Sequence, residues 1–384
     1  MERAALIARL REFAGAALVE RDGACFLVDP AWGERERAQW EALAARRPDG
    51  WDGARGWLCV PTGGSAGTMK LARHDERTLG AAVEGFCAHF DVARVDAVGL
   101  LPAWHVSGLL AWVRCAWTGG RHTAVRWKDV ESGASRPAGA GAFVSLVPTQ
   151  LARLLDDAPA VAWLKTFRAV LLGGGPAWPE ILAKARAAGV PVTLSYGMTE
   201  TAAMVAAQRP EEFAAGDTSC GRALPHARIR AGDDGRVRVG GASLFFGYWP
   251  EARMPEADGD WSTDDLGELD GLGRLRVKGR ADALIISGGE KVNPSEVEAA
   301  LREAGGAALG DVAVVGVPHV RWGQEVVAVL WGDRTRETAL REGVARLLAA
   351  AKRPRRYVWL AREAWPRDER GKLNRARLAE LARE

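Results

Sequence analysis

The sequence predicts an α/β protein with a large N-terminal domain of strand–helix units, which includes an antiparallel β subdomain, and a small, mobile α+β C-terminal domain. Three observations lead to this prediction. Apolar runs alternate with helical patterns in the first half, short alternating strands follow, and a separate set of helices and strands ends the chain. A chain of 384 residues exceeds what one core usually holds, so we expect two domains, which comprise residues 1–281 and 282–384.

The first region extends from about Trp57 to Gly197 and has the rhythm of parallel strands joined by helices. Its helical patterns are residues 75–90 and 179–189, in which apolar residues recur at spacings of three and four. The strand candidates are WLCVP, VDAVGLLP, AFVSLVP, FRAVLLGG and VPVTLSYG. In such a sheet, ligands gather at the carboxyl ends of the strands.

The pattern changes after about Ala206. Short alternating segments, HARIRAGDDGRVRVGG and GRLRVKGR, predict antiparallel strands. Past Arg280 a helical pattern at residues 294–305 precedes the strand candidates DVAVVGV and VVAVLWG and a further helix within 336–351. About one hundred residues are enough for a small separate domain.

Composition and charge exclude several classes of protein. The net charge is +3, and 48% of the residues are hydrophobic, as in ordinary globular domains. We therefore expect no nucleic-acid partner. The five cysteines form no CxxC pair, which predicts neither a zinc site nor a disulfide framework. The charged N-terminus and the absence of an apolar run of about 18 residues predict a cytoplasmic protein with no membrane span.

A glycine-rich segment follows the first strand candidate. Glycines let backbone N–H groups approach an anion closely, hydroxyls add donors, and a lysine supplies positive charge, so the segment could hold a polyphosphate. The residues concerned are Thr62, Gly63, Gly64, Ser65, Gly67 and Lys70. It is not a Walker A motif, because Lys70 comes three residues after Gly67. Taken alone, a glycine-rich turn has a purely structural role about as often as a ligand-binding one.

A second glycine cluster, Gly173 to Pro176, follows another strand candidate, and Tyr196 and Gly197 end the next. Adjacent strand ends would bring the Tyr196 ring beside the glycines, where it could lie against a planar base. Thr199 and Glu200 then add a hydroxyl and a carboxylate, and oxygen ligands beside phosphates are what Mg²⁺ requires.

Six ordered motifs complete the pattern. They are TGGSAGTMK, LLPAWHVSGL, SYGMTETA, STDDLGEL, VKGRADALIISGGEKVNPSEVE and PRDERGKLNR. In this order they resemble the adenylate-forming acyl-CoA synthetase (AMP-binding) superfamily over residues 57–384. Within it, LLPAWHVSGL, SLVPTQLARLL and LLGGGPAWPEIL look most like the 2-succinylbenzoate–CoA ligases of menaquinone and phylloquinone synthesis, in particular the short cyanobacterial type.

The resemblance implies roles for single residues. The segment from Thr62 to Lys70 would be the phosphate loop, Thr199 a phosphate contact and Glu200 the magnesium ligand. The implied adenine site comprises Gly174, Gly175, Pro176, Tyr196 and Gly197. Asp265 and Arg280 would hold the ribose, since a carboxylate accepts from two hydroxyls and a guanidinium bridges sugar and phosphate oxygens.

The remaining implied roles concern the acid and the tail. Asp282 matches the hinge between the domains, and Lys372 the lysine that contacts the carboxylate and α-phosphate during adenylation. The acyl pocket would be bordered by His105, Ser107 and Gly108, although a packed core histidine is an equal interpretation of His105. A dicarboxylate needs a second cationic anchor, for which Arg114 and Arg121 are the candidates to test.

The implied enzyme is an AMP-forming ligase that uses ATP, Mg²⁺ and coenzyme A and has a small organic acid as its substrate. Whether it forms a homo-oligomer is left open. Ala66 and Met69 in the phosphate loop, and Asp264 beside Asp265, depart from the usual pattern, as does the short N-terminal region. Two alternatives therefore stay open. One is a ligase for another aryl or short acyl acid, with CoA or a carrier protein as acceptor; the other is a non-catalytic nucleotide-binding homologue.

Overall fold

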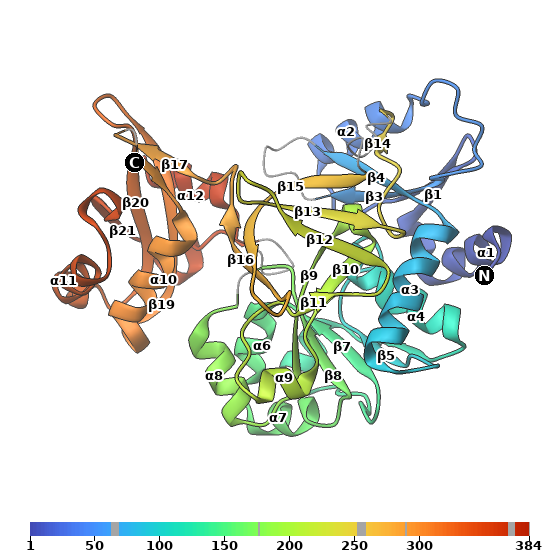
Figure 1. The fold of residues 1–384 in the computed structure, drawn as a ribbon, viewed down its shortest axis with the longest axis horizontal. Coiled ribbons are helices and arrows are strands. Elements are labelled where there is room, and N and C mark those ends of the chain that lie inside the picture. Colours follow the sequence, from blue (N-terminus) through green and yellow to red (C-terminus); the bar gives the residue numbers. More distant parts are fainter. Residues whose placement is uncertain (63–68, 176, 252–258, 289, 368–372, 384) are drawn as a thin grey trace. The chain divides into compact units, whose positions relative to one another are not determined.

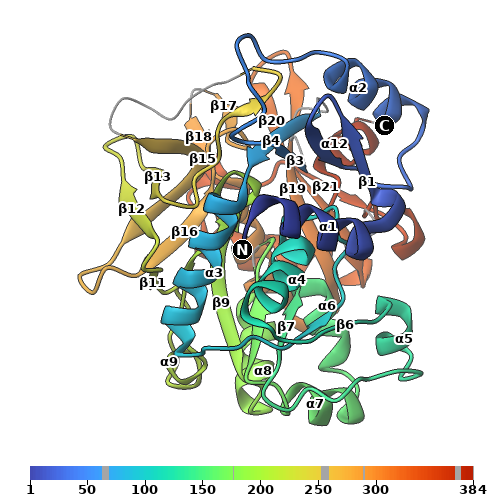
Figure 2. The same ribbon diagram turned by 90° about the vertical axis from the view of Figure 1, so that its right-hand side faces the viewer.

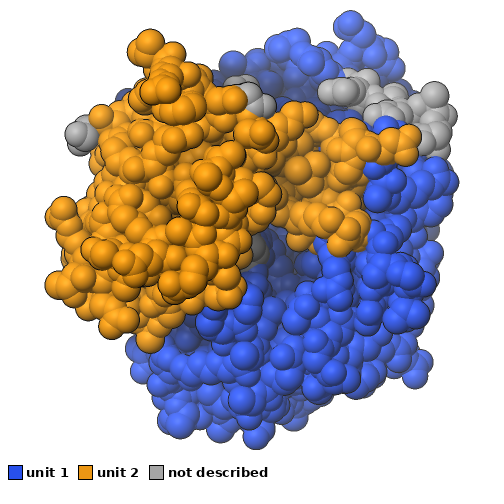
Figure 3. Space-filling model, turned by 60° about the vertical axis from the view of Figure 1, so that its left-hand side comes forward, with its two compact units in different colours: residues 1–232, 238–263, 269–276 blue, residues 233–237, 264–268, 277–384 orange. Residues whose placement is uncertain are grey.

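A computed structural model describes residues 1–62, 69–175, 177–251, 259–288, 290–367 and 373–383. The chain divides into two compact units, coloured separately in Figure 3. Unit 1 comprises residues 1–232, 238–263 and 269–276, and unit 2 comprises residues 233–237, 264–268 and 277–384. The predicted domain boundary at Asp282 stays a prediction.

Unit 1 contains a seven-stranded sheet in the order β11-β10-β9-β8-β7-β5-β6 (Figure 1). Its strands are β5 (Ala97–Gly99), β6 (His122–Ala124), β7 (Phe143–Leu146), β8 (Ala169–Leu172), β9 (Val192–Met198), β10 (Ala203–Ala207) and β11 (Arg222–Ala223). Strands β5 to β9 pair in parallel, whereas β10 and β11 are antiparallel additions. This confirms the α/β class and four of the five strand candidates.

Helices cover both faces of this sheet, because successive strand residues point to opposite sides. Val144 of β7 packs with α6 (Pro148–Leu154), α7 (Ala158–Leu164) and α8 (Pro179–Ala187), while the adjacent Phe143 packs with α3 (Glu76–Phe90) and α4 (Val106–Thr118). Figure 2 shows α3 and α4 side by side. Two short helices, α5 (Trp127–Glu131) and α9 (Pro210–Ala214), complete the connections.

Helix α3 shows how the sequence sets an element boundary. The Asp75 carboxylate accepts hydrogen bonds from the backbone N–H groups of Arg77 and Thr78, which satisfies donors left open at a helix start. The helix ends at Phe90, and the next residue, Asp91, is in the left-handed conformation. The predicted helix at residues 75–90 is thereby confirmed.

A second sheet of unit 1 has the order β1-β2-β3-β4-β14. Its strands are β1 (Leu18–Arg21), β2 (Ala24–Leu27), β3 (Leu58–Thr62), β4 (Lys70–His74) and β14 (Tyr248–Trp249), and α1 (Arg3–Ala14) and α2 (Glu34–Ala44) accompany it. The candidate strand WLCVP is β3, so placing it in the parallel sheet was wrong. It pairs antiparallel with β4, which follows without a helical crossover, and parallel neighbours require one.

A third sheet, in the order β12-β13-β15-β16, consists of β12 (Ala227–Ala231), β13 (Arg236–Gly241), β15 (Asp260–Leu269) and β16 (Leu275–Arg280). Strands β13, β15 and β16 carry the chain from one unit into the other. The antiparallel strands predicted after Ala206 are present as β12, β13 and β16. Sequence alternation alone does not reveal that single strands are shared between two units.

Unit 2 is built on the sheet β18-β17-β20-β19, to which β21 adds beside β20. Its strands are β17 (Ile285–Ser287), β18 (Glu290–Val292), β19 (Leu309–His319), β20 (Gly323–Gly332) and β21 (Arg356–Trp359), and its helices are α10 (Pro294–Gly305), α11 (Glu337–Leu347) and α12 (Arg375–Leu381). Alternate residues of β19 pack with α10 and α11 on one face and with α12 on the other. This confirms the predicted α+β arrangement.

Candidate active site

Lys70, Tyr248 and Glu200 form a connected group in unit 1. The Lys70 ammonium lies 5.0 Å from the centre of the Tyr248 ring, and the Tyr248 hydroxyl donates a hydrogen bond of 2.6 Å to Oε1 of Glu200. These residues meet because β14 pairs with β4, which places Tyr248 opposite Ala72, two residues beyond Lys70 on the same face. Sequence analysis missed Tyr248, because no local pattern indicates a pairing with so distant a strand.

Thr199 and Glu200 lie in a short 3-10 helix, Thr199–Thr201, directly after β9. The main chain is held on both sides of the Glu200 side chain: Nε2 of His74 bonds the Thr199 carbonyl at 2.7 Å, and the Phe245 N–H donates to the Glu200 carbonyl at 2.8 Å. Burial lowers the pKa of His74 to about 4. The imidazole is therefore neutral, and Nε2 carries its proton, since a carbonyl can only accept.

The predicted adenine residues lie on neighbouring strands. Strand β8 pairs with β9, and Leu172 is opposite Leu194, so the glycines after β8 are next to the strand that carries Tyr196, as expected. Gly174 has a φ of +78°, which favours glycine. A Cβ on Gly175 would contact nothing within 4 Å, which leaves open space on that side of the loop. The adenine-binding role itself stays a prediction.

Several predicted site residues lie outside the described ranges. They are Gly63, Gly64, Ser65 and Gly67 of the phosphate loop, Pro176 of the adenine site and Lys372 of the tail. The flanking residues are described: Thr62 ends β3 and pairs with Lys70, the first residue of β4. Thr62 and Lys70 therefore lie at the same end of this strand pair.

Asp265, Arg280 and Asp282 lie together in unit 2. The Arg280 guanidinium makes two bonds to Asp282, of 2.6 and 2.7 Å, and its Nη1 lies 3.4 Å from Oδ1 of Asp265. The hydrogen bonds that Arg280 donates to Asp282 raise the pKa of this guanidinium above its ordinary value. Asp264 is paired with Arg236 at 2.6 Å, so the additional charge at this position has a counter-ion within unit 2. The ribose and hinge roles stay predictions.

His105, Ser107 and Gly108 form the start of helix α4. His105 is the N-cap residue, in extended conformation, without a side-chain cap bond. A Cβ on Gly108 would lie 2.1 Å from the Pro102 carbonyl oxygen, so only glycine fits where the helix turns back against the preceding loop. The acyl-pocket role of these residues stays a prediction.

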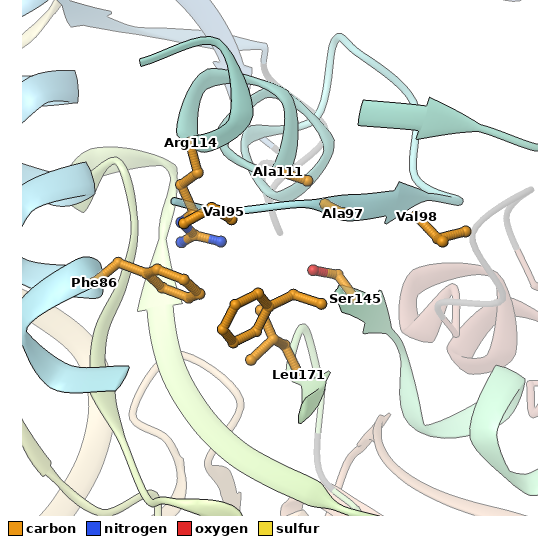
Figure 4. Close-up of a pocket in the computed structure, with 9 residues that line it drawn as sticks. Phe86, Val95, Ala97, Val98, Ala111, Arg114, Ser145 and Leu171 are labelled. Carbon is orange, nitrogen blue, oxygen red and sulfur yellow. The ribbon is translucent and has the colours of Figure 1, made fainter. Parts of the chain in front are cut away.

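A small cavity lies below α4, between that helix, α3 and the sheet (Figure 4). Arg114 points into it together with Phe86 and Ser145, and apolar residues complete the lining. The Arg114 side chain is buried, with its guanidinium carbon 4.0 Å from the centre of the Phe86 ring. Its Nε has no hydrogen-bond partner among the described residues. Burial lowers the pKa of Arg114 to about 10.

Arg121 differs from Arg114 in its burial. It is exposed and precedes β6, at the opposite end of α4 from His105, where its N–H bonds Asp96. Of the two arginines proposed from the sequence, Arg114 is the one that lines this cavity.

The residues present fit a magnesium ion that is held mainly by its nucleotide. Within the described ranges, no three His, Cys, Asp or Glu residues are grouped as metal ligands. Glu200 offers one carboxylate, and the described residues place no donor on its second oxygen. Mg²⁺ usually keeps several waters and binds through one or two carboxylates together with substrate phosphates.

The comparisons with known proteins identify the family of this chain. An AMP-binding enzyme model matches residues 13–249, and a model of the AMP-binding enzyme C-terminal domain matches residues 296–372. The chain therefore belongs to the AMP-binding enzyme family, which confirms the resemblance and the two-domain fold class.

No helix in the described part of the chain is both long and apolar enough to cross a bilayer.

Within this family, the chain is similar to 2-succinylbenzoate–CoA ligases. It is 33% identical over 299 residues to that of Enterococcus faecalis, covering 74% of this chain and 61% of the relative. It is 36% identical over 337 residues to a probable one of Mycobacterium tuberculosis, covering 84% of this chain and 83% of the relative. The chain thus spans less than two thirds of the first relative's length.

Solved structures of o-succinylbenzoate CoA synthetases are also similar to this chain. The o-succinylbenzoate CoA synthetase of Bacillus subtilis, in complex with its acyl-adenylate intermediate, superimposes with a TM-score of 0.74 at 26% identity, covering 98% of this chain and 81% of that one. The same enzyme in complex with ATP and a magnesium ion gives a TM-score of 0.72 at 25% identity, with 98% and 82% covered.

Proposed function

We propose that this chain joins 2-succinylbenzoate to coenzyme A at the expense of ATP, as an AMP-forming acid–thiol ligase of menaquinone biosynthesis. A substrate carboxylate oxygen attacks the α-phosphorus of ATP, and pyrophosphate leaves. The CoA thiol then attacks the acyl carbon, loses its proton and displaces AMP. Such transfers depend mainly on positioning and charge neutralisation, which is why no nucleophilic triad is needed.

The residues of unit 1 supply these two requirements. Lys70 offers a solvent-exposed ammonium to the phosphates, and Glu200 offers a carboxylate to the magnesium ion. When bound, that ion neutralises phosphate charge. The His74 bond to Thr199 fixes the main chain that carries both Thr199 and Glu200. We further propose that Lys372 adds a second ammonium during adenylation and that residues 282–384 rotate about Asp282 between the two half-reactions.

One observation carries the choice of acid, and it is the buried Arg114. 2-Succinylbenzoate has two carboxylates; one is activated, and the other must be accommodated as an anion. A buried guanidinium whose Nε has no partner is costly in the free protein and is well matched to a carboxylate. Arg114 lies on α4, the helix capped by His105, and we propose that it pairs with the second carboxylate of the bound acid. A monocarboxylic acid would leave this cation unpaired.

Pyrophosphate release across a panel of acids tests the proposal. We expect 2-succinylbenzoate to be preferred over its ring-carboxylate methyl ester and over benzoate, and Arg114→Met to raise KM for the diacid by about 100-fold with little change for the ester. Arg121→Met is the matched control. A carrier protein offered in place of CoA tests the alternative acceptor. Absence of acid-dependent pyrophosphate release would support a non-catalytic nucleotide-binding protein instead.

A cytoplasmic location is also part of the proposal. It rests on the cysteines, all five of which are free thiols. Burial raises the pKa of Cys25 to about 11, so this thiol resists oxidation. Fractionation of the native host cells would test the location.

A further inference from the structure

We propose that Tyr248 is a positioning residue for adenylation: its hydroxyl fixes the Glu200 carboxylate while its ring supports the Lys70 ammonium. The inference deepens the proposed function and rests on it. It assigns to one phenol the task of holding the metal-binding and the phosphate-binding groups in a single arrangement before the nucleotide arrives.

The first support is that the ring itself is held in place. Tyr248 belongs to β14, whose pairing with β4 fixes its backbone. The Phe245 ring packs against it edge-on at 5.0 Å between centres, and the Trp261 ring does so at 5.9 Å. Phe245 also donates its backbone N–H to the Glu200 carbonyl. The segment that carries Tyr248 therefore holds the carboxylate residue by both its main chain and its side chain.

The second support is the charge arrangement. Lys70 and Glu200 carry opposite charges close to the same ring, yet no ion pair joins them in the described part of the chain. A direct pair would engage the ammonium and the carboxylate with each other. Instead the ammonium lies over a neutral π face, to which it is attracted electrostatically, and the carboxylate accepts a hydrogen bond from the phenol. Both groups keep capacity for a ligand.

The third support is the geometry at Glu200. The phenol engages Oε1, so Oε2 is the oxygen left for a metal ion. A carboxylate held in this way presents one oxygen rather than a bidentate pair, which suits the octahedral geometry that Mg²⁺ requires. Removal of the hydroxyl should therefore weaken metal binding without removing the ligand itself.

Two variants separate the hydroxyl from the ring. Tyr248→Phe keeps the ring and loses the hydrogen bond, and we expect the Mg²⁺ concentration that gives half-maximal adenylation to rise by about 10-fold. Calorimetry adds a readout that is independent of turnover. The Kd for ATP with Mn²⁺ should rise by a similar factor, whereas the Kd for metal-free ATP should not change. Tyr248→Leu should weaken metal-free ATP binding as well, because Lys70 loses its support.

Tyr357→Phe is the matched control. Tyr357 lies in unit 2, where its ring stacks on Arg341, and its hydroxyl has no part in the proposal. In a Glu200→Gln background, Tyr248→Phe should add little further loss of Mn²⁺-dependent ATP binding, because the bond acts through the carboxylate. If Tyr248→Phe folds and binds Mn²⁺–ATP like the parent, the inference is wrong. If Tyr248→Phe fails to fold, Glu200→Asp decides instead, because it keeps a carboxylate but shortens its reach toward the Tyr248 hydroxyl: a Kd for Mn²⁺–ATP equal to that of the parent would overturn the inference.

The calorimetric readout separates this inference from the proposed function. A parent protein that binds Mn²⁺–ATP but activates no acid would remove the proposed function, and the Tyr248→Phe comparison of nucleotide affinities would still be decisive.

Discussion

Two cations of unit 1, Lys70 and Arg114, lie in opposite surroundings. Lys70 is exposed at the start of β4 and has the Tyr248 ring beside it. Arg114 is buried beneath α4, against Phe86, and its Nε has no partner among the described residues. The first cation keeps its water until a ligand comes, whereas the second has already lost most of it.

This difference separates two ways of preparing a site. A hydrated ammonium costs the fold little, and its attraction to phosphate does not depend on which acid is present. A desolvated guanidinium costs the fold stability, and only a ligand that carries its own anion into the cavity offsets that cost. We therefore expect the nucleotide side to determine the rate for every acid and the acyl side to determine which acid is used.

Lys372→Ala tests whether Lys372 acts on the nucleotide, as we propose for Lys70. Its expected effect on activity is the largest among the variants. We predict a loss of 1,000-fold or more, on the order seen for key electrostatic groups, in formation of the acyl-adenylate. Thioester formation from preformed acyl-adenylate and CoA should be nearly unchanged. An equal loss in both half-reactions, in a variant with an unchanged melting curve, would contradict the role assigned to Lys372.

Lys70→Met tests whether the contribution of Lys70 to activity is independent of which acid is used. We predict a fall of about 100-fold in kcat/KM, because one phosphate-stabilising charge is lost, and the factor should be the same for 2-succinylbenzoate and for its monoester. Steady-state pyrophosphate release with both acids is the measurement. A loss confined to the diacid would break the distinction between the two cations.

Arg114→Met tests the stability cost of the buried cation. Replacing an unpaired buried charge with an apolar chain of similar length should stabilise unit 1 by about 1–3 kcal/mol, partly offset by the lost contact with the Phe86 ring. Lys70→Met should stay within about 0.5 kcal/mol of the parent, as is usual for exposed positions. Urea unfolding followed by tryptophan fluorescence compares the two. A destabilised Arg114→Met would mean that this guanidinium has a structural partner.

The contrast between the two cations also shows where sequence reasoning reaches its limit. Strands β8 and β9 were predictable because the residues of each are close in the chain and their apolar pattern is regular. Tyr248 was not, since a two-residue strand, Tyr248–Trp249, pairs with β4 from far along the chain. Arg114 could be nominated as one of two arginines, but only burial distinguishes it from Arg121. The strand candidate WLCVP was assigned to the wrong sheet. Nothing in the sequence indicates that this strand pairs antiparallel with the strand that follows it directly, Lys70–His74.

His74 provides the smallest and most selective test, because it supports the nucleotide side without touching a ligand. Its pKa is lowered to about 4 by burial, below that of a free imidazole, so the unfolded chain binds the proton more readily. The stability that depends on neutral His74 is complete above about pH 6.5 and is lost as the pH falls toward 4. We expect up to about 1.4 kcal/mol per pH unit from this group.

His74→Gln should reduce that slope, since a carboxamide can still donate to the Thr199 carbonyl and does not titrate. Burial also lowers the pKa of His226 to about 4, so part of the slope should persist in the variant. Urea unfolding at pH 7, 6 and 5 measures the difference, with His319→Gln as a control because His319 is exposed in unit 2. An unchanged slope would mean that His74 stays neutral in the unfolded chain or charged in the folded one. A charged His74 in the folded chain would contradict the neutral imidazole inferred from its burial, and a neutral His74 in the unfolded chain would remove its contribution to the pH dependence of stability.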